Sequence, residues 1–262
     1  MHVLVTGAAR GIGAAVVECL MAAGHTITAC DIDLEGLAQR WGERAGAAYR
    51  ALDVTDVAAW SAAVEEAWNR QPVDVLINVA GVLRAGEVGE LLAPDVQAQV
   101  AVNVFGVIHG SNATAARMRE RGSGHIINVG STASVFATPG NGVYAATKHA
   151  VRGFSIAAAG DLRPHGVDVS LVCPSAVKTG MLEQQRGDRR AALTFEGARA
   201  LSPEEVAQAI VGEVMVNKPL EYYLPAADQW KGRLCTAFPN FFLSNVETAR
   251  QKGISHFDSP EH

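Results

Sequence analysis

The sequence predicts a doubly wound α/β domain, in which helices cover both faces of a parallel sheet. Three observations support this fold class. Short apolar runs alternate with longer segments of helical spacing. The runs are apolar throughout, which is typical of strands buried on both faces. A glycine-rich turn, TGAARGIG, follows the first apolar run and leads into the first helical segment.

The first two-thirds of the chain contain the predicted strands and helices of this sheet. The strands are Val3–Val5, Thr26–Cys30, Ala47–Leu52, Val75–Asn78, His125–Val129 and Val167–Cys173. The helices between them are Ala14–Ala23, Leu34–Arg44, Val57–Arg70, Val96–Arg121 and Val143–Arg163. This alternation predicts that a ligand binds at the carboxyl ends of the strands.

The chain changes character after Thr179. Met181–Ala200 is charged and Gln-rich, and we expect it to be mobile. A helix is predicted over Pro203–Val216, followed by a short strand near Tyr222–Leu224. The tail is aromatic without a clear period. We therefore predict one domain over residues 1–262, with a substrate lid at about 179–200 and a C-terminal aromatic extension at about 225–262.

Composition narrows the classes of function. Hydrophobic residues make up 48% of the 262 residues, which is enough for a large core. The net charge of -5, without a basic run, argues against a nucleic-acid partner. No stretch reaches the roughly 18 apolar residues of a membrane span. The four dispersed cysteines, the histidines without metal-ligand spacing and the absence of a leader predict a cytoplasmic protein without a metal.

The glycine turn predicts a site for a pyrophosphate. Backbone N–H groups can approach a phosphate where Gly7, Gly11 and Gly13 carry no side chain, and the helix N-terminus adds about half a positive charge. Arg10 and Ile12 lie in the same turn. A plain tight turn is the alternative. The position in the first βα unit, with an acid about 20 residues on, favours a dinucleotide site.

That acid is Asp31, at the end of the second predicted strand. Its carboxylate can accept hydrogen bonds from the adenosine ribose and would repel a 2′-phosphate, which favours NAD over NADP. The alternative is a helix N-cap, but Asp33 lies closer to the next helix. Arg10 favours NADP, and we rank Asp31 above it because the strand end faces the ribose.

Tyr144 and Lys148 lie four residues apart on a predicted helix and share one face. Tyrosine has a pKa of about 10, and a neighbouring ammonium favours the phenolate, as does the positive ring of an oxidised nicotinamide. Such a tyrosine can exchange a proton with an alcohol or carbonyl oxygen. Ser131, at the end of a predicted strand, can polarise the same oxygen. A Tyr–Lys pair at this spacing is common by chance, and a lone serine is usually only a loop residue, so neither feature alone indicates a catalytic site.

Together these motifs resemble the short-chain dehydrogenase/reductase family, over roughly residues 2–180. The resemblance lies in the order and spacing of TGAARGIG, LDVT at Leu52–Thr55, NVAG at Asn78–Gly81, Asn103 in VNVFG, Ser131, and YAATK at Tyr144–Lys148. The TGxxxGxG form and the short length are similar to the family's classical branch and not to its extended epimerase branch. The resemblance implies a Rossmann fold and an NAD(P)-dependent oxidoreductase acting on a CH–OH group.

The resemblance also implies roles for individual residues. Tyr144 would be the catalytic acid/base, and Lys148 would lower its pKa and bind the nicotinamide ribose. Ser131 would orient the substrate oxygen, and Asn103 would hold a water that links Lys148 to solvent. The remaining cofactor contacts would be Asp53 and Val54 at the adenine, Asn78, Ala80 and Gly81 beside the sheet, and Pro174, Val177 and Thr179 near the nicotinamide.

Three positions depart from the family pattern. The usual NNAG contains Val79, the usual paired serine is Gly130-Ser131, and the usual Pro-Gly is Pro174-Ser175. None of them removes a chemical group that the reaction needs.

The substrate is predicted to be a small molecule, a secondary alcohol or ketone with a hydrophobic body of the steroid, terpenoid, retinoid or fatty-acyl type. Phe136, Met181 and Leu182 are the candidates for its pocket. One alternative is an NADP-dependent 3-oxoacyl reductase, and another is a non-catalytic dinucleotide sensor. The resemblance further implies a homotetramer or homodimer, packed through the helices around Val96–Arg121 and Val143–Arg163.

Overall fold

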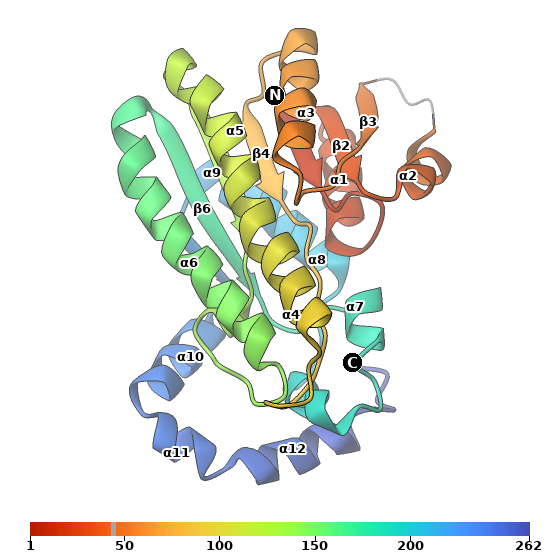
Figure 1. Ribbon diagram of the computed structural model, residues 1–262, viewed down its shortest axis with the longest axis vertical. Coiled ribbons are helices and arrows are strands. Elements are labelled where there is room, and N and C mark those ends of the chain that lie inside the picture. Colours follow the sequence, from red (N-terminus) through yellow and green to blue (C-terminus); the bar gives the residue numbers. More distant parts are fainter. Residues whose placement is uncertain (43–45) are drawn as a thin grey trace.

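Seven parallel strands form the centre of the computed structural model, which describes residues 1–42 and 46–262 (Figure 1). They are β1 (His2–Thr6), β2 (Thr26–Asp31), β3 (Ala47–Ala51), β4 (Val75–Asn78), β5 (Gly124–Val129), β6 (Val167–Pro174) and β7 (Glu221–Leu224). Their order across the sheet is β3-β2-β1-β4-β5-β6-β7. The predicted doubly wound class is confirmed, and each of the first six strands matches its predicted bounds to within one residue.

Helices cover both faces of the sheet because alternate strand residues point to opposite sides. Val3 and Val5 of β1 pack with α1 (Gly11–Ala22), α2 (Leu34–Trp41) and α8 (Pro203–Ala209). Leu4, between them, packs into a second cluster on the other face. The helices of that second cluster are α3 (Val57–Arg70), α5 (Gly106–Arg121) and α6 (Gly142–Leu162).

The remaining elements extend or connect this framework. They are α4 (Ala93–Val100), a π-helical segment (Ala101–Phe105), 3₁₀ turns at Thr132–Ser134 and Arg163–His165, α7 (Gly180–Glu183), a 3₁₀ helix (Arg189–Phe195), a second π-helical segment (Ile210–Val214), α9 (Met215–Asn217), α10 (Ala227–Ala237), α11 (Pro239–Leu243) and α12 (Val246–Ser255). The helices α10 to α12 lie beneath the carboxyl ends of the strands, at the bottom of Figure 1.

Two predicted helices differ in detail. The helix predicted over Leu34–Arg44 ends at Trp41, where Gly42 has a φ of 53° that stops it. Arg44 itself lies outside the described residues. The helix predicted over Val96–Arg121 begins three residues earlier, at Ala93, and Ala101–Phe105 is π-helical.

The expectation of a mobile Met181–Ala200 is not what the structure shows. This segment contains α7 and the 3₁₀ helix Arg189–Phe195, and it buries Leu182, Phe195 and Ala200 in a cluster of their own. Its charged side chains form ion pairs within the segment, as Arg186 does with Glu183, and with other elements, as Arg189 does with Glu247 of α12. The high charge therefore reflects the solvent face of a packed segment.

The strand order places a crevice beside β1. From β1 the chain runs outward to β2 and β3 and then returns to β4 on the other side of β1. Open α/β sheets bind ligands at the carboxyl ends of the strands at this reversal.

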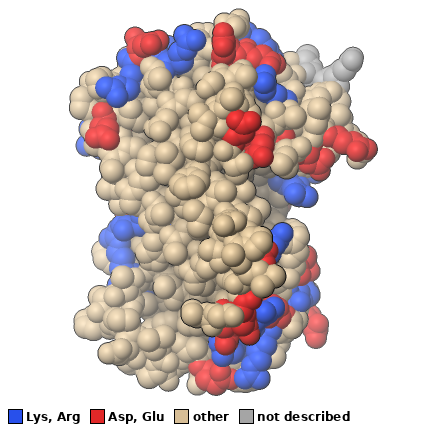
Figure 2. Space-filling view, viewed as in Figure 1, with Lys and Arg blue, Asp and Glu red and all other residues tan. Residues whose placement is uncertain are grey.

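The face of the molecule that carries α5 and α6 shows few charged side chains (Figure 2). Phe105, just before α5, is an apolar side chain that is 50% exposed. The predicted packing of subunits through these helices, as a homotetramer or homodimer, stays a prediction.

Candidate active site

A cleft of about 960 Å³ opens at the carboxyl ends of the strands. It brings together residues that are far apart in the sequence, as the motifs predict. Of the predicted site residues, only Asn78 and Asn103 do not line it. Those that do are Gly7, Arg10, Gly11, Ile12, Gly13, Asp31, Asp53, Val54, Ala80, Gly81, Ser131, Tyr144, Lys148, Pro174, Val177 and Thr179.

The glycine turn between β1 and α1 has no room for side chains. Gly7 has a φ of 67°, and a Cβ on it would lie 2.9 Å from the backbone nitrogen of Ala80. A Cβ on Gly13 would lie 2.1 Å from the carbonyl oxygen of Gly7. The turn thus lies tightly against both the next loop and its own helix. This geometry fits a pyrophosphate held by backbone N–H groups at the start of α1.

Thr6 contributes to this site, and the sequence analysis did not assign it a role. Its Oγ1 accepts hydrogen bonds from the backbone N–H groups of Val79, at 3.1 Å, and Ala80, at 3.2 Å. One side chain therefore joins the loop after β4 to the glycine turn. The clue in the sequence is a hydroxyl residue at the end of an otherwise apolar strand, directly before the first glycine.

Asp31 ends β2 and lies on the wall of the cleft, almost fully buried. Its Oδ2 accepts a hydrogen bond from the N–H of Ala9 and its Oδ1 one from the N–H of Asp33, both at 3.0 Å. These bonds fix the carboxylate and leave further lone pairs for a ligand hydroxyl. Asp33 caps α2 by accepting from the N–H of Gly36, as expected.

Tyr144 and Lys148 share one face of α6, beside the end of β5. The buried Nζ of Lys148 donates to the carbonyl oxygen of Val129 at 2.9 Å and lies 5.6 Å from the centre of the Tyr144 ring. Ser131 begins the 3₁₀ turn that follows β5, and its Oγ accepts from the N–H of Ala133 at 3.1 Å. All three side chains reach the cleft.

Asn103 lies beside this group but outside the cleft lining. Its Oδ1 accepts from the N–H of Val82 at 2.8 Å, and its Nδ2 donates to the carbonyl oxygen of Val82 and to Oγ1 of Thr147. The side chain therefore links the loop after β4 to α6. A π-helical segment often marks a functional position in a helix. The proposed water at Asn103 stays a prediction.

The side chain of Asn78 does not reach the cleft, and its predicted contact with the cofactor stays a prediction. Asn78 is buried, and its Nδ2 donates to Oδ1 of Asn128 at 2.9 Å and lies 3.3 Å from Oγ of Ser111. It lies at the last position of β4 and faces α5. Its role in the structure is to join β4 to β5 and α5, directly below the cleft.

Comparison with known proteins agrees with this arrangement. A profile described as short chain dehydrogenase matches residues 1–190. The chain belongs to the short-chain dehydrogenase family. It is therefore an oxidoreductase that acts on alcohol or ketone groups.

Individual relatives of this short-chain dehydrogenase cover most of its length. A 3-alpha-(or 20-beta)-hydroxysteroid dehydrogenase from Mycobacterium bovis is 37% identical over 212 residues, which cover 79% of this chain and 80% of the relative. A short chain dehydrogenase/reductase from Burkholderia phymatum, solved with NAD, has a TM-score of 0.81 at 26% identity and covers 94% of both chains. The closed form of a serine dehydrogenase with NADP+ has a TM-score of 0.76 at 30% identity and covers 85% of this chain and 94% of its own.

The structure explains one departure of this short-chain dehydrogenase from the family pattern. A Cβ on Gly130 would lie 2.9 Å from side-chain atoms of both Leu171 and Ser134. A serine at position 130 would therefore crowd the packing between β5 and β6. Ser134 instead places its hydroxyl next to Ser131, where its Oγ accepts from the Ser131 N–H.

The electrostatics of the pair differ from the expectation in this dehydrogenase. Desolvation raises the pKa of Tyr144 to about 12, and the hydrogen bond from Ser131 only partly opposes it. Desolvation also lowers the pKa of Lys148 to about 8. The protein alone therefore does not make the phenol acidic. The causes of the raised Tyr144 pKa are desolvation and the nearby Cys173, and the bond from Ser131 is the one cause that lowers it.

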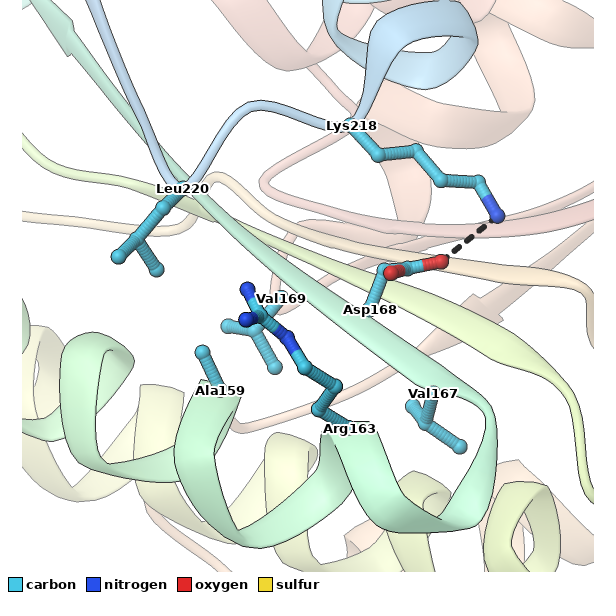
Figure 3. A pocket seen from close by; sticks show the side chains of 7 residues that line it. All are labelled: Ala159, Arg163, Val167, Asp168, Val169, Lys218 and Leu220. Carbon is cyan, nitrogen blue, oxygen red and sulfur yellow. Dashed lines mark hydrogen bonds and ion pairs between the residues drawn. The ribbon is translucent and has the colours of Figure 1, made fainter.

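A second, much smaller hollow of about 20 Å³ lies at the opposite end of β6 (Figure 3). Its polar feature is the ion pair between Lys218 and Asp168, at 2.7 Å. This volume suits about one water molecule.

Within residues 1–42 and 46–262, no acidic, histidine or cysteine cluster is suited to a metal ion. No helix among these described residues has the length and apolarity to span a membrane.

Proposed function

We propose that this dehydrogenase interconverts a secondary alcohol and a ketone with NAD(H), and that Tyr144 transfers the proton. The observation that carries this proposal is that Ser131, Tyr144 and Lys148 line the same cleft as the glycine turn and Asp31. A dinucleotide sensor would not need the first three of these side chains. Their convergence supports an enzyme with a proton path beside the cofactor.

A bound nicotinamide dinucleotide supplies the hydride acceptor or donor and, when oxidised, a positive charge beside the phenol. Ser131 donates a hydrogen bond to the substrate oxygen and orients it. Tyr144 accepts the hydroxyl proton during oxidation and returns it during reduction. Lys148, fixed by the Val129 carbonyl, binds the ribose and favours the phenolate. Asn103 keeps α6 and the loop at Val82 in register.

The walls of the cleft support a substrate with an apolar body. Phe136, Met181 and Leu182, the candidates for the substrate pocket, line the cleft together with Leu193. Phe136 packs edge-on against Phe242 of α11, with ring centres 4.5 Å apart. The segment at 179–200 and the extension at 225–262 both contribute lining residues, among them Leu193 and Gly232. A steroid-like secondary alcohol fits such a wall, and the hydroxysteroid relative acts on one by its name.

A panel of secondary alcohols and ketones, assayed with both NAD and NADP, tests the proposal. We expect turnover with NAD for at least one apolar secondary alcohol. Efficient reduction of 3-oxoacyl thioesters with NADPH would favour the alternative, a 3-oxoacyl reductase. Dinucleotide binding without turnover of any panel member would instead indicate a sensor.

Replacing Asp31 with alanine is expected to shift the ratio of kcat/KM with NAD to kcat/KM with NADP toward NADP by roughly tenfold or more. The physical reason is that a like charge beside a 2′-phosphate costs up to several kcal/mol. Arg10, on the same cleft wall, can then pair with that phosphate. Steady-state kinetics with both cofactors measures the ratio.

Two further variants separate charge from shape at this position. Asp31→Asn removes the charge and keeps an acceptor for the Ala9 N–H, so we expect it to shift the ratio in the same direction. Adding Arg10→Ala to Asp31→Ala should remove the gain with NADP. An unchanged ratio in Asp31→Ala would show that Asp31 does not select the cofactor.

A further inference from the structure

The substrate half of the cleft contains three polar side chains that the proposed reaction does not use. Asn141 is the N-cap residue of α6, Gln185 follows α7, and Thr194 belongs to the 3₁₀ helix Arg189–Phe195. All three line the cleft. Asn141 is 5% exposed and Gln185 is 4% exposed. Buried amides need hydrogen-bond partners. The hydrogen bonds of these three residues therefore show which of their polar atoms has no partner.

The three side chains form one hydrogen-bonded triad, here called the polar triad. Nδ2 of Asn141 donates to Oγ1 of Thr194 at 3.0 Å and lies 3.4 Å from Oε1 of Gln185. The Thr194 hydroxyl donates to Oε1 of Gln185 at 3.0 Å, and Nε2 of Gln185 donates to the carbonyl oxygen of Met181 at 3.0 Å. The Thr194 hydroxyl donates its proton to Gln185, so its oxygen can only accept from Asn141. The Asn141 atom that faces Thr194 is therefore the Nδ2 donor, and Oδ1 points the other way.

One atom of the polar triad remains unsatisfied. Oδ1 of Asn141 is buried and, among the described residues, has no hydrogen-bond partner. An unpaired buried acceptor costs about 1–3 kcal/mol. The backbone around it is held closely, because a Cβ on Gly140 would lie 1.8 Å from the carbonyl oxygen of Arg190. Asn141 itself lines the cleft, so the triad holds a fixed, unpaired acceptor beside it.

We propose, resting on the function proposed above, that Oδ1 of Asn141 accepts a hydrogen bond from a second hydroxyl of the substrate. Asn141 is the N-cap residue directly before α6, three residues before Tyr144, and both residues line the cleft. The second hydroxyl therefore lies within a few carbons of the reacting carbon. A neutral donor fits better than an ammonium, because the polar triad contains no carboxylate to balance a buried charge.

The preferred substrates are thus diols or hydroxyketones on an otherwise apolar body. The test compares matched pairs that differ by one hydroxyl: butane-2,3-diol and butane-1,3-diol against butan-2-ol, and 3-hydroxybutan-2-one against butan-2-one. We expect the wild type to prefer a hydroxylated member by roughly tenfold or more in kcat/KM. Asn141→Leu is expected to abolish this preference while keeping turnover of butan-2-ol.

Gln184→Leu is the matched control, because Gln184 lines the same cleft but is exposed and lies outside the polar triad. It should keep the preference. Thr194→Val provides a second variant that frees the Asn141 amide, and we expect it to weaken the preference. Thermal unfolding shows whether each variant is folded.

The same pairs are also compared for binding to the NADH complex by nicotinamide fluorescence, so the inference is tested even if no panel member is turned over. Absence of turnover with a retained binding preference would overturn the proposed reaction and support the hydroxyl site. Equal kcat/KM and equal binding within every pair for the wild type would overturn the inference. A preference that persists unchanged in Asn141→Leu would also overturn it.

Discussion

Replacing Tyr144 with phenylalanine is expected to lower kcat/KM by roughly 10²- to 10⁴-fold, which is the usual contribution of a positioned proton donor or acceptor. The change removes one oxygen and keeps the ring, so the contacts of α6 stay in place. NADH binding should be unchanged, because the glycine turn, Asp31 and Lys148 are intact. Steady-state kinetics and a fluorescence titration with NADH measure the two effects separately.

Tyr222→Phe is the matched control, because Tyr222 lies in β7, is partly buried and is not part of the cleft lining. It should keep wild-type turnover. The pH profile gives a second criterion. The pKa of Tyr144 is raised to about 12, so the phenolate fraction, and with it the rate of alcohol oxidation, should rise with pH through the alkaline range. The residual rate of Tyr144→Phe should not follow this rise, and near-wild-type turnover in that variant would remove Tyr144 from the reaction.

The arrangement of the sheet could be predicted because its cause is local. Strands such as β4 and β5 are short apolar runs, and each is followed by a segment with helical spacing. Buried parallel strands need apolar residues on both faces, so the pattern is visible without tertiary information. The glycine turn is equally local, since its three glycines and their strand and helix are adjacent in the sequence.

The details that the sequence could not provide depend on contacts between distant segments. Asn78 has the composition of a cofactor contact, but the alternation along β4 turns its side chain toward Ser111 and Asn128. Met181–Ala200 has the composition of a mobile loop, but α12 packs against it closely enough that a Cβ on Gly253 would lie 1.9 Å from the carbonyl oxygen of Ala192. Neither partner is near in sequence, so no local pattern announces the contact.

The protonation state of Tyr144 depends on information of a different kind. The spacing of Tyr144 and Lys148 is local and was correctly placed on one face of α6. The depth of burial is not local, and it is desolvation that raises one pKa and lowers the other. A sequence motif can therefore identify two reacting groups without giving their protonation states. The positive charge of an oxidised nicotinamide lowers the pKa of a neighbouring phenol, an effect that the Tyr144–Lys148 pair alone does not provide.

Replacing Gly13 with alanine is expected to destabilise the protein by about 1–3 kcal/mol and to weaken NADH binding strongly. The added Cβ would lie 2.1 Å from the carbonyl oxygen of Gly7 and 2.6 Å from its carbonyl carbon. Both are backbone atoms, so no side-chain rotation can relieve the overlap, and overpacking of this kind costs about 1–3 kcal/mol. To make room, α1 must move away from the glycine turn, which displaces the N–H groups that would hold the pyrophosphate.

The control for this effect is Gly153→Ala, in the middle of α6, where no atom lies within 4 Å of the added Cβ. Alanine is favoured over glycine inside a helix by about 0.5–1 kcal/mol, so this variant should unfold at an equal or higher urea concentration than the wild type. Urea unfolding without cofactor and NADH titration of the folded variants separate the stability effect from the binding effect. If Gly13→Ala unfolded at the wild-type urea concentration and bound NADH with wild-type affinity, the close contact between α1 and the glycine turn would not be what shapes the dinucleotide site.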